Sequence, residues 1–399
     1  MSSRNLVLFS AFAVLLVPGG ALADELDTLQ FRASQSFQHD SNVFRLSDGA
    51  DTQAILKTPN RSDTVSTTSV GLKLNKPYGL QRFELDASIE HSNYQRFSNL
   101  DFTAVNYAAA WRWSVTPALH GNLTADRKEY VDTSADVQIS GQLNRRTNRL
   151  TALDAEYELD GVWRVLGGVF ERTSTGSQAS TFEGDSKLVG AEAGVRYAFP
   201  SGSSLAYRFK NGGGKYTNRA STTAVSSDFT DREHELKGEW GDGTRTKVQG
   251  RIAHFQRTHD SLPRRDFSGL IGQADATYAL TGKTSVTAGV VRDLGSYQTG
   301  TASYYRGSRI FVAPTWKPTV LTAVRFRYDF GVRDFRGPLP GFAASNRRDK
   351  ISLASLALEW QALRALKLTA WIQRDVRKSN EPNADYKSNA IGISAQASF

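Results

Sequence analysis

The strongest constraint on this chain is the almost constant interval at which turn-forming residues recur. Eight clusters, marked by Tyr78, Pro117, Asp160, Gly202, Asp242, Gly282, Pro318 and Ala362, follow one another after 36 to 44 residues. Most contain the glycine, proline or aspartate that ends strands and reverses the chain, and Gln361-Ala362 is the weakest of them. Longer polar stretches such as 40–63 and 336–347 lie between clusters. The sequence therefore predicts a series of hairpins in which a tight turn alternates with a longer loop.

Apolar and polar residues alternate along the segments that flank each turn. Residues 83–90 read FELDASIE, and residues 324–333 read VRFRYDFGVR. A period of two places the apolar residues on one face of a strand, which a helix with 3.6 residues per turn cannot do. A propeller blade would divide about 40 residues into four short strands, whereas one tight turn and one loop leave room for two strands of bilayer-crossing length. We predict an all-β, transmembrane, antiparallel up-and-down barrel of about 18 strands, within a range of about 16–18.

Composition removes several other classes of protein. The mean hydropathy of −0.42 excludes a bundle of membrane-spanning helices, each of which needs about 20 consecutive apolar residues. The absence of cysteine excludes disulfide scaffolds, thiol catalysis and zinc sites built from cysteine. The formal net charge is +9, but the 49 basic residues form no dense tract, so nucleic acid is not an expected partner.

The first 23 residues have the features of a secretory signal peptide. Arg4 precedes an uninterrupted apolar segment, residues 6–17, and a Pro-Gly-Gly break follows it. Ala21-Leu22-Ala23 then fits the small-x-small cleavage pattern. The apolar segment is too short for a spanning helix, so an uncleaved anchor is the weaker alternative. We expect residues 1–23 to direct the chain out of the cytoplasm and residues 24–399 to form an outer-membrane barrel.

Aromatic residues and the final segment favour a membrane location. Tryptophan lies close to the tight turns at six of its seven positions, namely Trp111, Trp113, Trp163, Trp240, Trp316 and Trp360. We interpret these residues as a ring at one membrane boundary, because aromatic packing beneath a soluble sheet would not confine tryptophan to one end of each hairpin. Residues 386–399 alternate and end on Phe399, as expected of a strand that closes the barrel. This ending resembles the strand that the bacterial barrel-assembly machinery recognises, so that machinery and outer-membrane lipid are expected partners.

The segment after the first expected strand carries a family resemblance. It reads His39-Asp40-Ser41-Asn42-Val43-Phe44-Arg45-Leu46. Together with the chain length and the barrel pattern, this segment resembles a family of outer-membrane barrels encoded in exopolysaccharide operons, the β-barrel porins of the second type. The resemblance implies a channel that exports a secreted polysaccharide, with the polysaccharide and other envelope export components as partners.

The residues that alternate with the apolar face would line an aqueous interior. The basic residues among them that we select as pore-lining candidates are Arg208, Lys210, Lys247, Arg251, Arg325 and Arg327. Arginine binds carboxylate and phosphate well, so an acidic sugar chain is the expected passenger. The alternative is that these side chains pair with Asp and Glu and stiffen the barrel without selecting a solute. A register slip of one residue would move every one of these candidates to the lipid-facing side. Pro314 lies inside an expected strand, where we expect it to cause a bulge or an earlier strand end.

Four functions are compatible with the sequence. Polysaccharide export leads, and a general or solute-specific diffusion porin is the alternative; a structural barrel with a plugged lumen and an enzyme at the outer rim are weaker. His39 and His259 fall at expected outer strand ends, but the sequence lacks a Gly-x-Ser-x-Gly elbow and zinc-binding histidine spacings. We interpret both histidines as solvated rim residues and expect no enzymatic activity, metal or cofactor.

Overall fold

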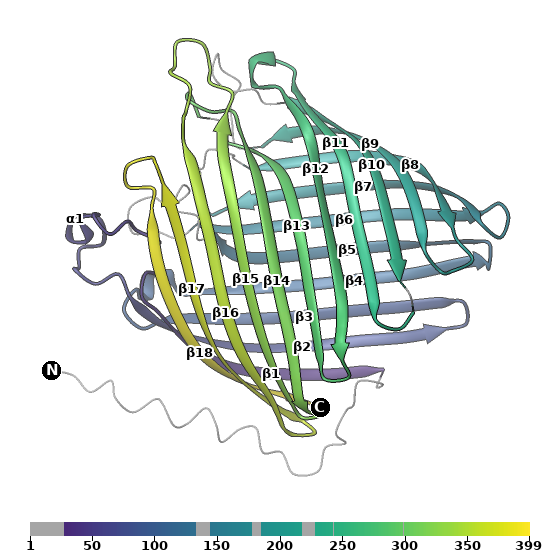
Figure 1. Ribbon diagram of the computed structural model, residues 1–399, viewed down its shortest axis with the longest axis horizontal. Coiled ribbons are helices and arrows are strands. Elements are labelled where there is room, and N and C mark those ends of the chain that lie inside the picture. Colours follow the sequence, from purple (N-terminus) through teal and green to yellow (C-terminus); the bar gives the residue numbers. More distant parts are fainter. Residues whose placement is uncertain (1–27, 133–143, 178–184, 218–227, 242, 298) are drawn as a thin grey trace.

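Alternating strands and tight turns build one closed antiparallel sheet (Figure 1). The computed structural model describes residues 28–132, 144–177, 185–217, 228–241, 243–297 and 299–399. Each strand pairs with its neighbours in sequence, and β1 also pairs with β18, so the sheet closes into the predicted barrel of 18 strands. The strands are β1 (Leu29–Asp40), β2 (Asp63–Tyr78), β3 (Gln81–Tyr94), β4 (Phe102–Thr116), β5 (Leu119–Asp132), β6 (Asn144–Glu158), β7 (Trp163–Gly176), β8 (Ser186–Ala198), β9 (Ser204–Tyr216), β10 (Asp228–Gly241), β11 (Thr246–His259), β12 (Phe267–Thr281), β13 (Thr284–Ser296), β14 (Tyr304–Thr319), β15 (Thr322–Arg336), β16 (Arg348–Leu363), β17 (Leu366–Ser379) and β18 (Tyr386–Ser398).

Short helical segments occur only in the loops of the described part of the chain. They are α1 (Thr52–Leu56), η1 (Ser98–Leu100) and η2 (Pro263–Arg265). None of the helices in the described ranges is long and apolar enough to cross a bilayer. The expected signal peptide, residues 1–23, lies outside the described residues, so its assignment stays a prediction.

The tight turns follow the predicted interval, with three corrections. Tyr78 is the last residue of β2, and the turn comes one residue later, at 79–80. Pro318 and Ala362 lie inside β14 and β16, and the turns come two residues later, at 320–321 and 364–365. Pairing extends the strands past the expected breaks, because the N–H of Lys317 donates to the carbonyl oxygen of Lys283 (2.7 Å). The marker Asp242 lies outside the described residues, between β10 and β11.

Pro314 does not disturb its strand in the way the sequence predicts. It lies opposite Val286 in the regular pairing of β14 with β13. On the other side, Val312 pairs with Tyr328, and Thr315 pairs with Arg325, so the register with β15 is the same before and after the proline. The expected bulge or early strand end is therefore wrong. The regular β13 pairing holds β14 in place, although proline cannot donate a hydrogen bond.

The register decides which side chains share a face of the sheet. Residues directly opposite one another in an antiparallel pair project from the same face. Arg208 lies opposite Glu235, which lies opposite Ala253, and the pairings continue around the barrel without a change of face. The four register shifts between the described strands all lie in the last residues before a tight turn. The barrel therefore has one continuous inner face and one continuous outer face.

The outer face carries a broad apolar belt. Val70, Ile89, Ile252, Ile310 and Ile393 lie on it and are 51–59% exposed. Near the turns, the same face presents Trp111, Trp163, Trp240, Trp316 and Trp360, which are 42–52% exposed. A belt of this kind suits hydrocarbon, where a Lys or Arg at the middle of the bilayer would cost about 2–4 kcal/mol. The ring of tryptophans is placed as predicted, at one edge of the belt.

The seventh tryptophan belongs to the inner face. Trp371 on β17 lies directly opposite Gly392 on β18. A Cβ atom at Gly392 would lie only 2.6 Å from the indole ring. Glycine is therefore required here by the close approach of the ring, which fills the position where a side chain would stand.

The His-Asp-Ser-Asn-Val-Phe-Arg-Leu segment forms the seam at which β1 meets β18. Asp40 is only 5% exposed. Its carboxylate accepts hydrogen bonds from the Asn42 backbone (2.8 Å), the Ser388 hydroxyl (2.5 Å) and the Arg45 guanidinium (2.9 Å). The Asn42 amide donates to the carbonyl oxygen of Lys387 (3.0 Å). The segment thus links the start of the first long loop to the last strand.

The same segment also supplies a hydrophobic anchor. Val43 and Phe44 are buried with Tyr94 and Phe97. The rings of Phe44 and Phe97 meet edge to face, with their centroids 4.9 Å apart. This packing holds the first long loop against β3 at the end of the barrel where the longer loops lie.

Candidate functional site

Three of the six predicted basic residues form ion pairs on the inner face, Arg208 in a separate pair and Lys210 and Arg251 in one network. Arg208 contacts Glu192 on β8 (3.0 Å). Lys210 and Arg251 both contact Glu233 and Glu235 on β10; Lys210 does so at 3.3 and 3.1 Å, and Arg251 at 2.6 and 2.8 Å. The carboxylates therefore compensate much of the positive charge on β9 and β11.

The other three predicted residues lie elsewhere on the inner face. Arg325 pairs with Glu359 (2.8 Å), and Arg327 makes two hydrogen bonds to Asp329 (2.7 and 2.8 Å). The Arg327 guanidinium also lies 4.3 Å from the ring centre of Phe311. Lys247 is exposed near the turn end of β11 and has no ion-pair partner within the described residues.

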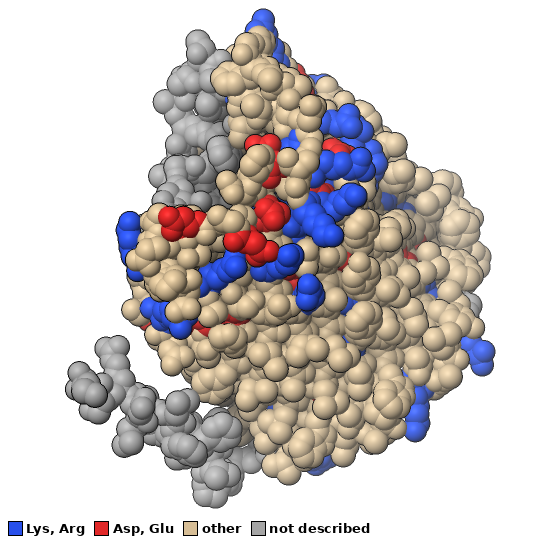
Figure 2. Space-filling model, turned by 60° about the vertical axis from the view of Figure 1, so that its left-hand side comes forward, with Lys and Arg blue, Asp and Glu red and all other residues tan. Residues whose placement is uncertain are grey.

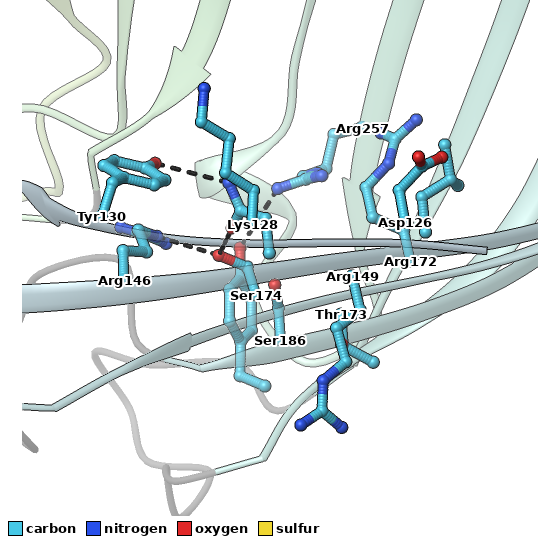
Figure 3. A pocket seen from close by; sticks show the side chains of 13 residues that line it. Asp126, Lys128, Tyr130, Arg146, Arg149, Arg172, Thr173, Ser174, Ser186 and Arg257 are labelled. Carbon is cyan, nitrogen blue, oxygen red and sulfur yellow. Dashed lines mark hydrogen bonds between the residues drawn. The ribbon is translucent and has the colours of Figure 1, made fainter. Parts of the chain in front are cut away.

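A cavity of about 560 Å³ on the inner face is strongly basic (Figure 3). Its inner-face cations come from four strands: Lys128 on β5, Arg146 on β6, Arg172 on β7 and Arg257 on β11. Asp126 is the one carboxylate among its described lining residues. Several neutral polar groups complete the wall, among them Tyr130, Asn148, Ser174, Ser186 and Tyr216.

Hydrogen bonds order one side of this cavity. The Arg146 guanidinium donates to the Ser174 hydroxyl (2.8 Å), which donates to Asn148 (2.7 Å). Arg257 forms a bidentate pair with Asp231 (2.7 and 2.8 Å) and lies 4.1 Å from the ring centre of Phe229. Such contacts fix the direction of a guanidinium before any solute arrives.

Two cations of the cavity remain uncompensated by the described residues. Lys128 and Arg172 are exposed, and within the described part of the chain neither has a hydrogen-bond or ion-pair partner. Figure 3 shows the Lys128 side chain extending away from the hydrogen-bonded group around Ser174. A cavity with two such cations beside two oriented guanidinium groups can bind an anion through charge-assisted hydrogen bonds.

The predicted network and the basic cavity adjoin one another. A second cavity of about 300 Å³ is lined by Lys210, Glu233 and Arg251, and it shares Arg172 and Arg257 with the first. The candidate site is therefore a charged track along the wall formed by β5 to β11. Figure 2 shows one face of the molecule, on which charged side chains of both signs gather in the upper part and few lie in the lower part.

The two rim histidines differ from each other and, in one case, from the prediction. His39 is exposed, and its ring lies 3.0 Å from the Thr64 hydroxyl. His259 is only 3% exposed, so the interpretation as a solvated residue is wrong for it. Its ring lies near Tyr216, Phe229 and Phe267, because the inner face is crowded with aromatic rings at this height.

Solved structures of other proteins share this fold over most of the chain. No protein-family model and no curated protein matches the sequence. The crystal structure of Pseudomonas aeruginosa OpdK with vanillate matches with a TM-score of 0.51 and 12% identity, covering 93% of this chain and 99% of that chain. P. aeruginosa OccK2 in complex with glucuronate matches with a TM-score of 0.52 and 12% identity, covering 93% and 98%. A BenF-like porin from Pseudomonas fluorescens Pf-5 matches with a TM-score of 0.51 and 12% identity, covering 93% and 99%.

At this level of identity, the comparison establishes the fold. The chain has the closed 18-stranded antiparallel barrel that is seen in outer-membrane porins. The resemblance to exopolysaccharide-operon barrels receives no support, because no family model matches the sequence.

Proposed function

We propose that this protein is an outer-membrane porin that passes small anionic solutes and binds them transiently in the basic cavity. The observation that carries the proposal is the pair of cations, Lys128 and Arg172, that no described residue compensates on the inner face. An anion entering the barrel would meet these charges without having to displace a resident carboxylate. Because binding is confined to a few groups in a hydrated cavity, release remains fast enough for transport.

The size and chemistry of the cavity support a small organic acid as the solute. A volume of about 560 Å³ lies within the range of about 300–1,000 Å³ that is usual for small-molecule sites. Structures that share this fold have been solved with vanillate and with glucuronate, both of which carry a carboxylate. Apolar and aromatic side chains near the cations, such as Leu150 and Tyr216, would accept the uncharged part of such a solute.

Polysaccharide export has less support than diffusion of a small solute. The predicted basic residues that were to hold an acidic sugar chain are mostly occupied by ion pairs with Glu and Asp. The barrel would still be wide enough for water and small molecules. We therefore favour diffusion of small solutes as the function. Polysaccharide export is the alternative that the following experiment tests.

The test compares ion selectivity and solute block in planar bilayers. Replacing Lys128 and Arg172 with Gln is expected to lower the preference for chloride over potassium and to weaken block by glucuronate roughly 30-fold, since each of the two charges contributes about 1 kcal/mol at contact distance in water. The control replaces Lys187 and Lys215, outer-face residues of the adjoining β8 and β9, and should change neither property. Absence of ion current, or unchanged selectivity in the inner-face variant, would overturn the proposal. Block by a long acidic polysaccharide but not by glucuronate would favour export.

A further inference from the structure

The outer face of β16, β17 and β18 carries a cluster of basic residues beyond the apolar belt. We define the outer basic cluster as Lys350 on β16, Arg374 and Lys378 on β17, and Lys387 on β18. Lys350 lies directly opposite Lys378, and Lys387 lies directly opposite Val376, which separates the two basic residues of β17. The four side chains therefore project from one small area of the outer face. These neighbouring strands are the yellow and yellow-green ones in Figure 1.

The fold leaves most of this charge uncompensated. Lys387 contacts Asp48 in the first long loop (2.9 Å). Lys350, Arg374 and Lys378 are exposed and have no ion-pair partner within the described residues. The register puts no Asp or Glu on the outer face of these three strands, all of which are described in full. Because like charges directly opposite one another destabilise a sheet, the Lys350–Lys378 pair is unfavourable unless an anion joins it.

The height of the cluster matches the far boundary of the membrane. Lys350 lies ten residues from Trp360 along β16. That separation is ~34 Å along the strand at ~3.4 Å per residue, and ~26 Å along the barrel axis at a tilt of ~40°. The apolar band of such barrels is about 25 Å tall, so the ammonium groups of Lys350 and of Lys378 opposite it stand at the headgroup level when the tryptophan ring stands at the opposite boundary. Lys387 and Arg374 lie closer to the apolar belt, opposite Val376 and Ala354.

The residues below the cluster are suited to acyl chains. On the outer face, Ile372 precedes Arg374 on β17, and Ile391 follows Lys387 and Asn389 on β18. Both isoleucines are more than half exposed. The surface therefore offers cations to a phosphate and, directly beneath them, apolar side chains to the chains of the same molecule. A free phosphate ion would use only the first of these features.

We infer that the outer basic cluster binds the phosphorylated headgroup of a lipid in the outer leaflet. The inference goes beyond solute transport and depends only on the membrane location within the proposed function. The cluster lies on the face opposite to the basic cavity. Loss of lipid binding and loss of transport are therefore separate outcomes.

The experiment measures lipid binding to the detergent-solubilised full barrel by native mass spectrometry. The probes are dioleoyl phosphatidic acid, the diacylglycerol with the same chains, and inorganic phosphate. Wild-type protein should retain phosphatidic acid in preference to both. Replacing Lys350, Arg374 and Lys378 with Gln should weaken its binding roughly 100-fold, because each basic residue near an anionic surface contributes about fivefold. Glucuronate block in planar bilayers should be unchanged.

Two further variants make the result specific. Replacing Lys76, Lys283 and Arg364, basic residues near the turn end, removes the same charge and should leave binding within about twofold of wild type, because these residues lie at the other boundary. Lys378→Glu should abolish binding while raising the unfolding temperature, since an ion pair with Lys350 replaces repulsion. Equal binding of diacylglycerol, equal binding of inorganic phosphate, or full retention of phosphatidic acid by the triple variant would each overturn the inference.

Discussion

Asp40→Asn is the most informative single substitution for the stability of the barrel. The carboxylate is buried and accepts three hydrogen bonds, from the Asn42 N–H, the Ser388 hydroxyl and the Arg45 guanidinium. Asparagine has the same shape but no charge. Its NH2 group would replace one carboxylate oxygen and would face hydrogen-bond donors from which that oxygen now accepts. Of its two ion pairs within the described residues, Arg45 would keep only the one with Asp375, at 3.4 Å from its Nε atom.

The expected loss follows from these contacts. Breaking a buried ion pair by removing one partner costs about 3–5 kcal/mol, most of it from the charge that is left behind. Asp375 compensates part of that charge, so we expect the free energy of unfolding to fall by about 3 kcal/mol. The measurement is equilibrium unfolding by guanidinium chloride in detergent micelles, followed by tryptophan fluorescence.

A matched control separates the seam from surface electrostatics. Asp48→Asn removes an exposed carboxylate that contacts Lys387 at 2.9 Å. Exposed pairs of this kind are worth about 0–1 kcal/mol, so the control should unfold close to wild type. If Asp40→Asn also unfolds within about 1 kcal/mol of wild type, the reasoning that assigns the seam a buried ion pair is refuted.

Three further outcomes are expected. Gly392→Leu should lower the unfolding midpoint and shift Trp371 fluorescence, because a Cβ at this position would lie 2.6 Å from the indole ring; an unchanged spectrum would contradict the close approach. Arg327→Glu should reduce chloride selectivity more than Arg327→Gln, because it places a second carboxylate beside Asp329; bilayer reversal potentials check this order. Hydrogen bonds from the backbone of Trp163 and Val162 lower the pKa of Asp160, so its contribution to stability is present above the unfolded-state pKa and is lost as the pH falls through the depressed pKa. The difference in unfolding midpoint between wild type and Asp160→Ala should therefore disappear in acid.

The architecture is predictable from this sequence because its causes are local. Alternation over a few residues sets the two faces of each strand, and turn chemistry between strands sets the hairpin interval. The positions of Pro318 and Ala362 mark where this reasoning fails. Turn-like residues there are held in strands by pairing with neighbours, as the Lys317–Lys283 hydrogen bond shows.

The site is less predictable, because compensation of charge depends on neighbours that are distant in sequence. Arg251 and Arg172 are the same residue type in the same kind of alternating strand, so the sequence cannot rank them. In the barrel, β10 supplies Glu233 and Glu235 to Arg251, while Arg172 on β7 receives no carboxylate within the described residues. Nothing in the sequence around Lys128, apart from its position in a strand, indicates that this residue lines a binding cavity. The seam segment can be recognised in the sequence as a motif. Its partner cannot, because Ser388, which donates to Asp40, lies 348 residues away.

The constant division of side chains between the two faces of the barrel restricts how the length of such a chain can change during evolution. Inserting or deleting one residue within a strand would turn the lipid-facing side chains of the rest of that strand toward water, and the water-facing ones toward lipid. Insertions of any size in the connecting loops leave every strand in phase. Length differences among descendants of this gene should therefore accumulate in the loops, and those within strands should come in twos.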